Sequence, residues 1–217
     1  MEKVCVTCRG KSLRSIKLVP SVDHFVVVND FSSGEIKIPG LPDALGNTPI
    51  THIFNWNTYV NEVPVMIAQQ FYTTYNVTAI VSPYTVEAGY KPFEVAGRYG
   101  VIPFKHYPDE LKPYLWYDDS PKAKYKWDYP SSGNGAILYG AAIATKELHI
   151  IGLDFFQAGV HGYASGAPIA PGHDGDDMRK FLIEQTFEMF PHIEFFIYTC
   201  AAVGNVPSNV TVIRVDQ

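Results

Sequence analysis

Short apolar runs rich in Val, Ile and Phe recur along this chain and alternate with stretches of helical composition. The runs predict β-strands over residues 3–7, 24–29, 51–55, 77–81, 101–105, 147–153, 194–199 and 210–215. Helical composition is found over residues 62–75, 136–145 and 176–190. Because apolar strands that alternate with helices bury both faces of their sheet, the pattern predicts an α/β fold with a mainly parallel sheet and helices on both faces.

The length and composition narrow the possible folds and functions further. A chain of 217 residues fits one Rossmann-like domain, spanning 1–217. A composition with 47% hydrophobic and 14% aromatic residues excludes disorder, collagen and coiled coil. The net charge of −5 argues against a broad nucleic-acid surface, and three cysteines make a disulfide framework improbable. Without a signal-peptide pattern or a stretch long enough to span a bilayer, we expect a soluble cytoplasmic protein with no stable membrane insertion. The many aromatic residues are compatible with a homo-oligomer.

Two segments break the alternation of strands and helices. Residues 106–130 hold four prolines among Tyr, Trp, Asp and Lys and predict an irregular insertion, which could be a lid, an acceptor-facing wall or a solvated excursion. Residues 155–175 are bounded by glycines and predict a mobile lid loop that can close over a ligand.

Polar side chains and one glycine follow several of the apolar strands directly. These residues are Arg9, Gly10, Ser12, Asn29, Asp30, Asn55, Asn57 and Asp154. Each by itself is what an ordinary loop contains. Because ligands bind outside the carboxyl ends of parallel strands, however, the set predicts a binding edge.

A Ser-Ser-Gly sequence, Ser131, Ser132 and Gly133, stands before a helix rich in small residues. The free N–H groups of a helix start attract a carboxylate or a phosphate. Small residues such as Gly140 also explain close packing of this helix on the sheet without any ligand, so both interpretations stay open.

A single histidine lies in an acidic turn at the predicted start of the helix near residue 176. His173 is followed by Asp174 and Asp176, and a neighbouring carboxylate can orient an imidazole as a general base. The alternatives are a surface histidine in a capping turn and a metal site that includes His161, although the spacing matches no strong metal motif.

These residues resemble the bacterial sialyltransferases of glycosyltransferase family 42 over most of the chain and in the same order. The stretch 152–159, Gly-Leu-Asp-Phe-Phe-Gln-Ala-Gly, is similar to the family's Gly-Ile-Asp-Phe-Tyr-Gln-Asn-Gly. Residues 10–13 resemble the end of its first-loop pattern, and 131–133 resemble its Thr-Ser-Gly helix start. Tyr163 and His173 match a tyrosine near the donor phosphate and the catalytic histidine.

The resemblance implies inverting transfer of sialic acid or a related sugar from a CMP-sugar donor to a glycan acceptor. His173 would act as the general base and Tyr163 would donate to the leaving phosphate. The donor would be held by Gly10, Ser12, Asn29, Asn55, Ser131, Ser132, Gly133 and Asp154. The family chemistry needs no cofactor and no metal.

The chain departs from the family's pattern at five positions. They are Cys8, Arg9, Tyr129, Phe156 and Ala170, and Arg9 replaces the first-loop asparagine by a cation. Two alternatives therefore remain. One is an inactive nucleotide-sugar-binding relative. The other is an enzyme similar to 6-hydroxymethylpterin diphosphokinase, which would use ATP and Mg²⁺ and which residues 152–154 and 161–166 also resemble.

Overall fold

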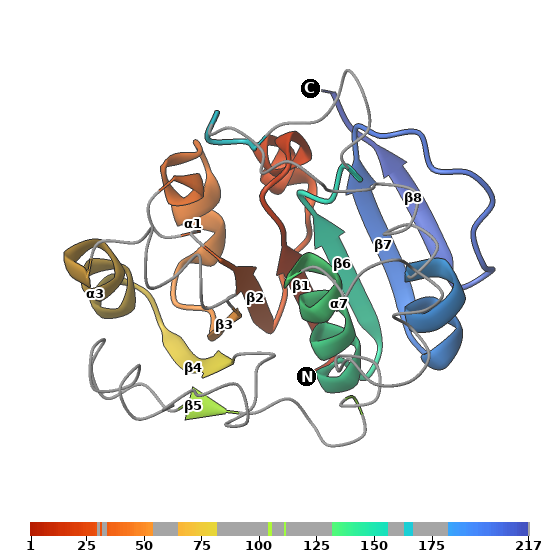
Figure 1. The fold of residues 1–217 in the computed structure, drawn as a ribbon, viewed down its shortest axis with the longest axis horizontal. Helices are drawn as coiled ribbons and strands as arrows, with labels where there is room; N and C mark the ends of the chain where they lie inside the picture. Colours follow the sequence, from red (N-terminus) through yellow and green to blue (C-terminus); the bar gives the residue numbers. More distant parts are fainter. Residues whose placement is uncertain are drawn as a thin grey trace.

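A computed structural model gives the fold of this protein. It describes residues 1–29, 31, 34–53, 65–81, 104–105, 111, 132–155, 163–166 and 182–216. These residues build one twisted sheet with helices on both sides (Figure 1).

All neighbouring strands of the sheet are parallel. The strands are β1 (Lys3–Thr7), β2 (His24–Val28), β3 (Ile50–Ile53), β4 (Val77–Val81), β5 (Phe104–Lys105), β6 (Glu147–Ile151), β7 (Glu194–Thr199) and β8 (Val210–Arg214). Their order in the sheet is β5-β4-β3-β2-β1-β6-β7-β8. The chain therefore builds outward from β1 to one edge, returns to pair β6 with β1, and builds outward to the other edge. This places the topological switch point, where parallel sheets bind ligands, between β1 and β6.

Alternating residues of each strand feed two separate hydrophobic clusters. Val4 and Val6 of β1 face one cluster, whereas Cys5 between them faces the other. The first cluster is covered by α7 (Ser132–Ile143) and by η5 (Leu182–Phe187), and Figure 1 shows these helices on one side of the sheet. The predicted parallel sheet buried on both faces is thus confirmed.

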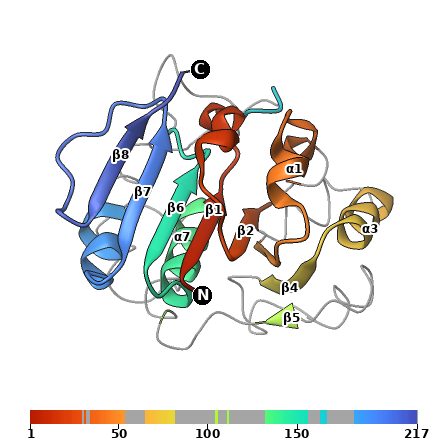
Figure 2. The same ribbon diagram turned by 180° about the vertical axis from the view of Figure 1, so that it is seen from behind.

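The second cluster is covered by elements from the first half of the chain, which Figure 2 shows from behind. They are η1 (Lys11–Leu18), η2 (Glu35–Lys37), α1 (Leu41–Leu45) and α3 (Val65–Thr74). Of these, η1, η2 and α1 were not predicted from the sequence. Their short length leaves too few apolar repeats to show a helical period.

Helix α7 lies close to the sheet because it carries a glycine at the contact. A Cβ atom on Gly140 would lie 2.7 Å from Cγ2 of Val6 and 3.0 Å from Cδ1 of Leu148. The packing interpretation of the small residues in this helix is therefore correct at Gly140.

The described part of the helix predicted over 176–190 differs from the α-helical expectation. Residues 182–187 form a π-helix, and only 188–189 are α-helical. Leu182, Thr186 and Phe187 are buried while Gln185 is only half-buried. Of the predicted stripe, Leu182 is buried and Met189 packs against the first cluster, whereas Gln185 departs from it. Phe187 is buried with Leu182 because a π-turn brings residues i and i+5 onto one side.

No helix in the described part of the chain is both long enough and apolar enough to cross a bilayer.

Candidate functional site at the switch point

The loops that follow β1 and β6 are joined directly at the switch point. The N–H of Cys8 donates to the carbonyl of Ile151 at 2.7 Å, and the N–H of Gly10 donates to the carbonyl of Gly152 at 2.6 Å. A Cβ atom on Gly10 would lie 2.5 Å from Oδ2 of Asp154 and 2.6 Å from the Gly152 carbonyl oxygen. Only glycine fits at residue 10, so its presence in the sequence has a structural cause.

Asp154 gathers three strand ends around one buried carboxylate. Its Oδ2 accepts from the N–H of Ser12 at 2.8 Å, and its Oδ1 accepts from the Thr199 hydroxyl and the Cys200 N–H, each at 3.0 Å. The Ser12 hydroxyl in turn accepts from the N–H of Gly152 at 3.0 Å. Since a carboxylate has about four acceptor positions, the described donors leave it about one for a ligand hydroxyl.

Asn29 ends β2 in the left-handed backbone region, with φ of 50°. Its N–H donates to the Ile53 carbonyl at 2.7 Å, and its carbonyl oxygen lies 2.6 Å from Nε2 of His52. Nδ1 of His52 lies 2.8 Å from the hydroxyl of Tyr72 on α3. The imidazole therefore carries its proton on Nε2, donates it to Asn29 and accepts from Tyr72. His52 was not predicted from the sequence, although a histidine within an apolar strand was a visible signal.

Tyr163 lies beside the loop after β1. Tyr163 forms an antiparallel bridge with Gly10, and the N–H of Ala164 donates to the Arg9 carbonyl at 2.7 Å. The guanidinium carbon of Arg9 lies 4.2 Å from the centre of the Tyr163 ring. The predicted lid loop over 155–175 is thus attached to the first loop through its described residues 163–166. Apart from these and Phe155, that prediction falls outside the described residues.

The start of α7 lies toward the same carboxyl edge of the sheet as these residues. Its carboxyl end is near the amino end of β1, where the Thr145 N–H donates to the Met1 carbonyl at 2.8 Å. A helix of 12 residues rises about 18 Å, which carries Ser132 and Gly133 back toward the carboxyl ends of the strands. The structure therefore brings Gly10, Ser12, Asp154 and Tyr163 together, with Asn29 and the start of α7 along the same edge.

Three predicted positions lie outside the described residues. They are the proposed base His173, the donor-contacting Asn55 and the first helix-start serine, Ser131. The predicted insertion over 106–130 is described only at Leu111, which is buried in the cluster beneath α7.

The thiols near the switch point are held in their protonated form. Burial, with a smaller contribution from the Asp154 carboxylate, raises the pKa of Cys8 to about 12 and that of Cys200 to about 11. Neither thiol supplies a nucleophile near neutral pH, since the thiolate is the reactive form.

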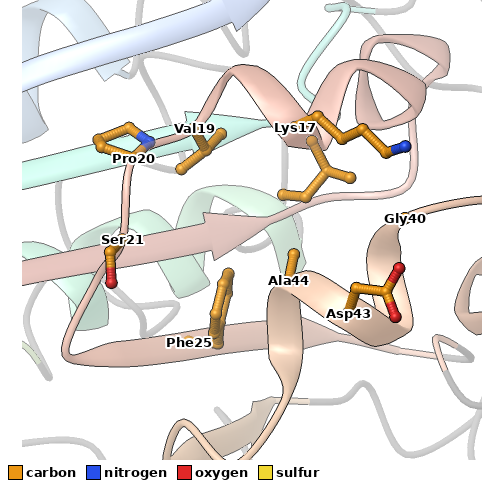
Figure 3. A pocket seen from close by; sticks show the side chains of 9 residues that line it. Lys17, Val19, Pro20, Ser21, Phe25, Gly40, Asp43 and Ala44 are labelled. Atoms are coloured by element: carbon orange, nitrogen blue, oxygen red, sulfur yellow. The ribbon is translucent and has the colours of Figure 1, made fainter.

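A cavity of about 330 Å³ lies away from this edge, between η1, the start of β2 and α1. Lys17, Phe25 and Asp43 are among the residues that line it (Figure 3), and none of the predicted site residues does. Within the described ranges no three His, Cys, Asp or Glu side chains come together to hold a metal ion.

The fold and this edge define a parallel α/β protein with a switch point between β1 and β6, the place where parallel sheets bind ligands. Comparison with solved structures finds a similar architecture in sialyltransferases. The chain has 18% identity and a TM-score of 0.54 to the sialyltransferase CstII from Campylobacter jejuni in complex with cytidine-5'-monophosphate, covering 93% of this chain and 80% of that one. It has 17% identity and a TM-score of 0.53 to CST-II with trisaccharide acceptor and CMP, over 90% and 80%. For CstII in complex with the substrate analogue CMP-3FNeuAc the identity is 18% and the TM-score 0.53, over 91% and 81%.

Sequence comparison gives no such match. No protein-family model and no curated protein sequence matches this chain. The likeness is therefore one of structure, and it shows that the chain has a sialyltransferase-like fold.

Proposed function

We propose that this protein is a glycosyltransferase that transfers sialic acid or a related sugar from a CMP-sugar donor to a glycan acceptor. Two observations support the proposal. The fold matches CMP-bound sialyltransferases over about nine-tenths of the chain, and Gly10, Ser12, Asp154 and Tyr163 lie together at its switch point.

The described residues have the chemistry to hold such a donor. The remaining acceptor position of Asp154 suits a ribose hydroxyl, and Tyr163 beside Gly10 suits the phosphate. Asn29 lies along the same edge, and the helix start at Ser132 offers free N–H groups to the sugar carboxylate. Held there, the donor presents its anomeric carbon at the carboxyl edge of the sheet.

The proposed reaction is an inverting displacement. His173 takes the proton of the acceptor hydroxyl while that oxygen forms a bond to the anomeric carbon. The bond from the anomeric carbon to the phosphate oxygen breaks, CMP leaves with the electron pair, and Tyr163 donates to its phosphate. No metal or cofactor is needed for this step.

Ligand-dependent melting tests the donor class. CMP binds only the folded state, so a concentration of about 100 times its Kd adds about 2.7 kcal/mol to the free energy of unfolding and raises Tm without added metal. Matched samples receive ATP with Mg²⁺, and stabilisation by that pair alone would favour the diphosphokinase-like alternative. No response to either ligand would contradict both.

Replacing the base separates an active enzyme from an inactive relative. We expect His173→Ala to abolish turnover of a CMP-sugar while CMP still raises Tm, because the base acts only on the acceptor. His192→Gln, at an exposed histidine, is the matched control and should leave turnover unchanged. Unchanged turnover in His173→Ala would show that another group is the base.

A further inference from the structure

A buried ion pair contacts the ring of Tyr163 through its arginine. Nε of Arg9 is 3.1 Å from Oε2 of Glu35, and the two side chains are only 9% and 0% exposed. Burial raises the pKa of the Glu35 carboxyl, and the Arg9 cation opposes that rise. Burying two charges costs free energy because both are removed from water. Their mutual attraction offsets that cost only where the geometry of the pair is good.

Both members of the pair contact the segment 163–166 that contains Tyr163. The Arg9 guanidinium lies over the Tyr163 ring, and the Ser165 hydroxyl donates to Oε1 of Glu35 at 2.9 Å. Arg14 donates to the carbonyl of Ala164 through Nη2 at 2.9 Å. The segment 163–166 is therefore held by the loop after β1 and by η2 together.

Position 9 is one of the five positions at which this chain departs from the sialyltransferase pattern. Where that pattern has a first-loop asparagine, this chain has an arginine that pairs with Glu35 and whose guanidinium carbon lies over the Tyr163 ring. A guanidinium can do both at once, since it stacks on an aromatic ring while its N–H groups bond a carboxylate.

We propose that Arg9 and Glu35 are positioning residues that fix the ring of Tyr163 against the donor phosphate. This inference rests on the proposed function for the identity of the ligand. Arg9 acts through Tyr163, and Glu35 acts by holding the Arg9 guanidinium over the Tyr163 ring.

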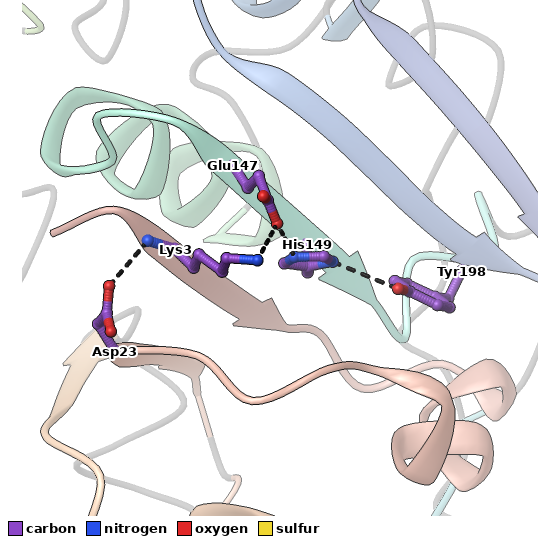
Figure 4. Close-up of polar contacts among 5 residues, drawn as sticks. All are labelled: Lys3, Asp23, Glu147, His149 and Tyr198. Atoms are coloured by element: carbon purple, nitrogen blue, oxygen red, sulfur yellow. Dashed lines mark hydrogen bonds and ion pairs between the residues drawn. The ribbon is translucent and has the colours of Figure 1, made fainter.

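The test reads the Tyr163 ring directly in the full chain without ligand. Tyrosines are replaced by 3-fluorotyrosine, and the ¹⁹F resonance of Tyr163 is assigned by its absence in Tyr163→Phe. The variants are Arg9→Met, Arg9→Lys and Glu35→Gln. Lys3→Met is the matched control, because Lys3 pairs with Glu147 at 3.0 Å at the opposite end of β1 and is 35% exposed (Figure 4).

We expect Arg9→Met and Glu35→Gln to shift or broaden the Tyr163 resonance and to weaken CMP binding about tenfold, in line with the loss of a desolvated cation–π contact. Arg9→Lys should restore neither property in full, because an ammonium lacks the forked N–H groups with which a guanidinium contacts the ring and the carboxylate at once. Lys3→Met should leave both unchanged.

Several results would overturn the inference. One is an unshifted Tyr163 resonance in Arg9→Met or Glu35→Gln, and another is full recovery of the resonance and of CMP binding in Arg9→Lys. If a single variant does not fold, the double variant Arg9→Met with Glu35→Gln removes both charges together, and an unshifted resonance there counts equally against it. If the resonance moves but wild-type protein binds no CMP, the proposed function fails while the positioning of the ring stands.

Discussion

The imidazole of His52 couples the stability of this protein to pH at the scale of one residue. Burial lowers the pKa of His52 to about 4 from 6.5, opposed by its hydrogen bond to Asn29. Between pH 4 and pH 6.5 the unfolded chain binds a proton at this histidine that the folded protein does not. The contribution of His52 to the free energy of unfolding is therefore fully present above about pH 6.5 and is lost as the pH drops toward 4. At 1.36 kcal/mol per unit, this loss amounts to about 3 kcal/mol.

The measurement is urea unfolding of wild type and His52→Gln near pH 7 and near pH 4.5. Glutamine keeps an N–H for the Asn29 carbonyl but leaves the Tyr72 hydroxyl without its acceptor, so we expect a cost of about 1–3 kcal/mol near pH 7. This difference in unfolding free energy between wild type and His52→Gln should become smaller by about 2 kcal/mol near pH 4.5, because glutamine does not titrate. A difference in unfolding free energy between wild type and His52→Gln that does not change with pH would contradict the assignment.

Single residues also show how far the sequence could lead toward the site. Gly10, Ser12, Asp154 and Tyr163 could be found because strand ends and a family pattern point to them. Glu35 and Thr199 could not, since their role depends on contacts between loops that lie far apart in the chain. Nothing in a strand pattern says that a carboxylate at residue 35 will meet a guanidinium at residue 9.

At the scale of elements, the strands were predictable and the short helices were not. β1, β4 and β7 have the predicted bounds, because a buried parallel strand is a continuous apolar run with clear ends. The 3-10 helices η1 and η2 and the five-residue α1 are fixed by packing against the second cluster. The π-geometry of η5 likewise has no periodic signal of its own in six residues.

The π-helix η5 carries a defect that a substitution can relieve. Thr186 is fully buried, and its hydroxyl has no hydrogen-bond partner in the part of the chain that the structure describes. Thr186→Val replaces that hydroxyl by a methyl group of similar shape, so we expect about 1 kcal/mol of added stability in urea unfolding. Thr199→Val is the control, because its hydroxyl donates to the Asp154 carboxylate and its loss should destabilise. Destabilisation by Thr186→Val would show that its hydroxyl is bonded in solution.

At the scale of the whole molecule, Asp154 joins the two halves of the sheet. It follows β6, accepts from Ser12 after β1, and accepts from Thr199 and Cys200 at the end of β7. β1 begins the half that runs to β5, whereas β6 and β7 belong to the half that ends at β8. One carboxylate therefore links the strand ends on both sides of the switch point, where the proposed donor binds.

Asp154→Asn tests this linkage through amide hydrogen exchange across the sheet. The amide NH₂ would face one of the three donors, and because each hydrogen bond to a charged group contributes about 1.5–3 kcal/mol, we expect a loss of about 3 kcal/mol in global stability. Protection should fall together in β1, β2, β6 and β7, since their slowest exchange reports global unfolding. Asp23→Asn, whose carboxylate accepts from the Lys3 N–H at 3.0 Å at an exposed position (Figure 4), is the matched control and should change protection only near the amino end of β1. If Asp154→Asn lowered protection only in the half that contains β6 and β7, the carboxylate would hold its own loop and not the junction of the sheet.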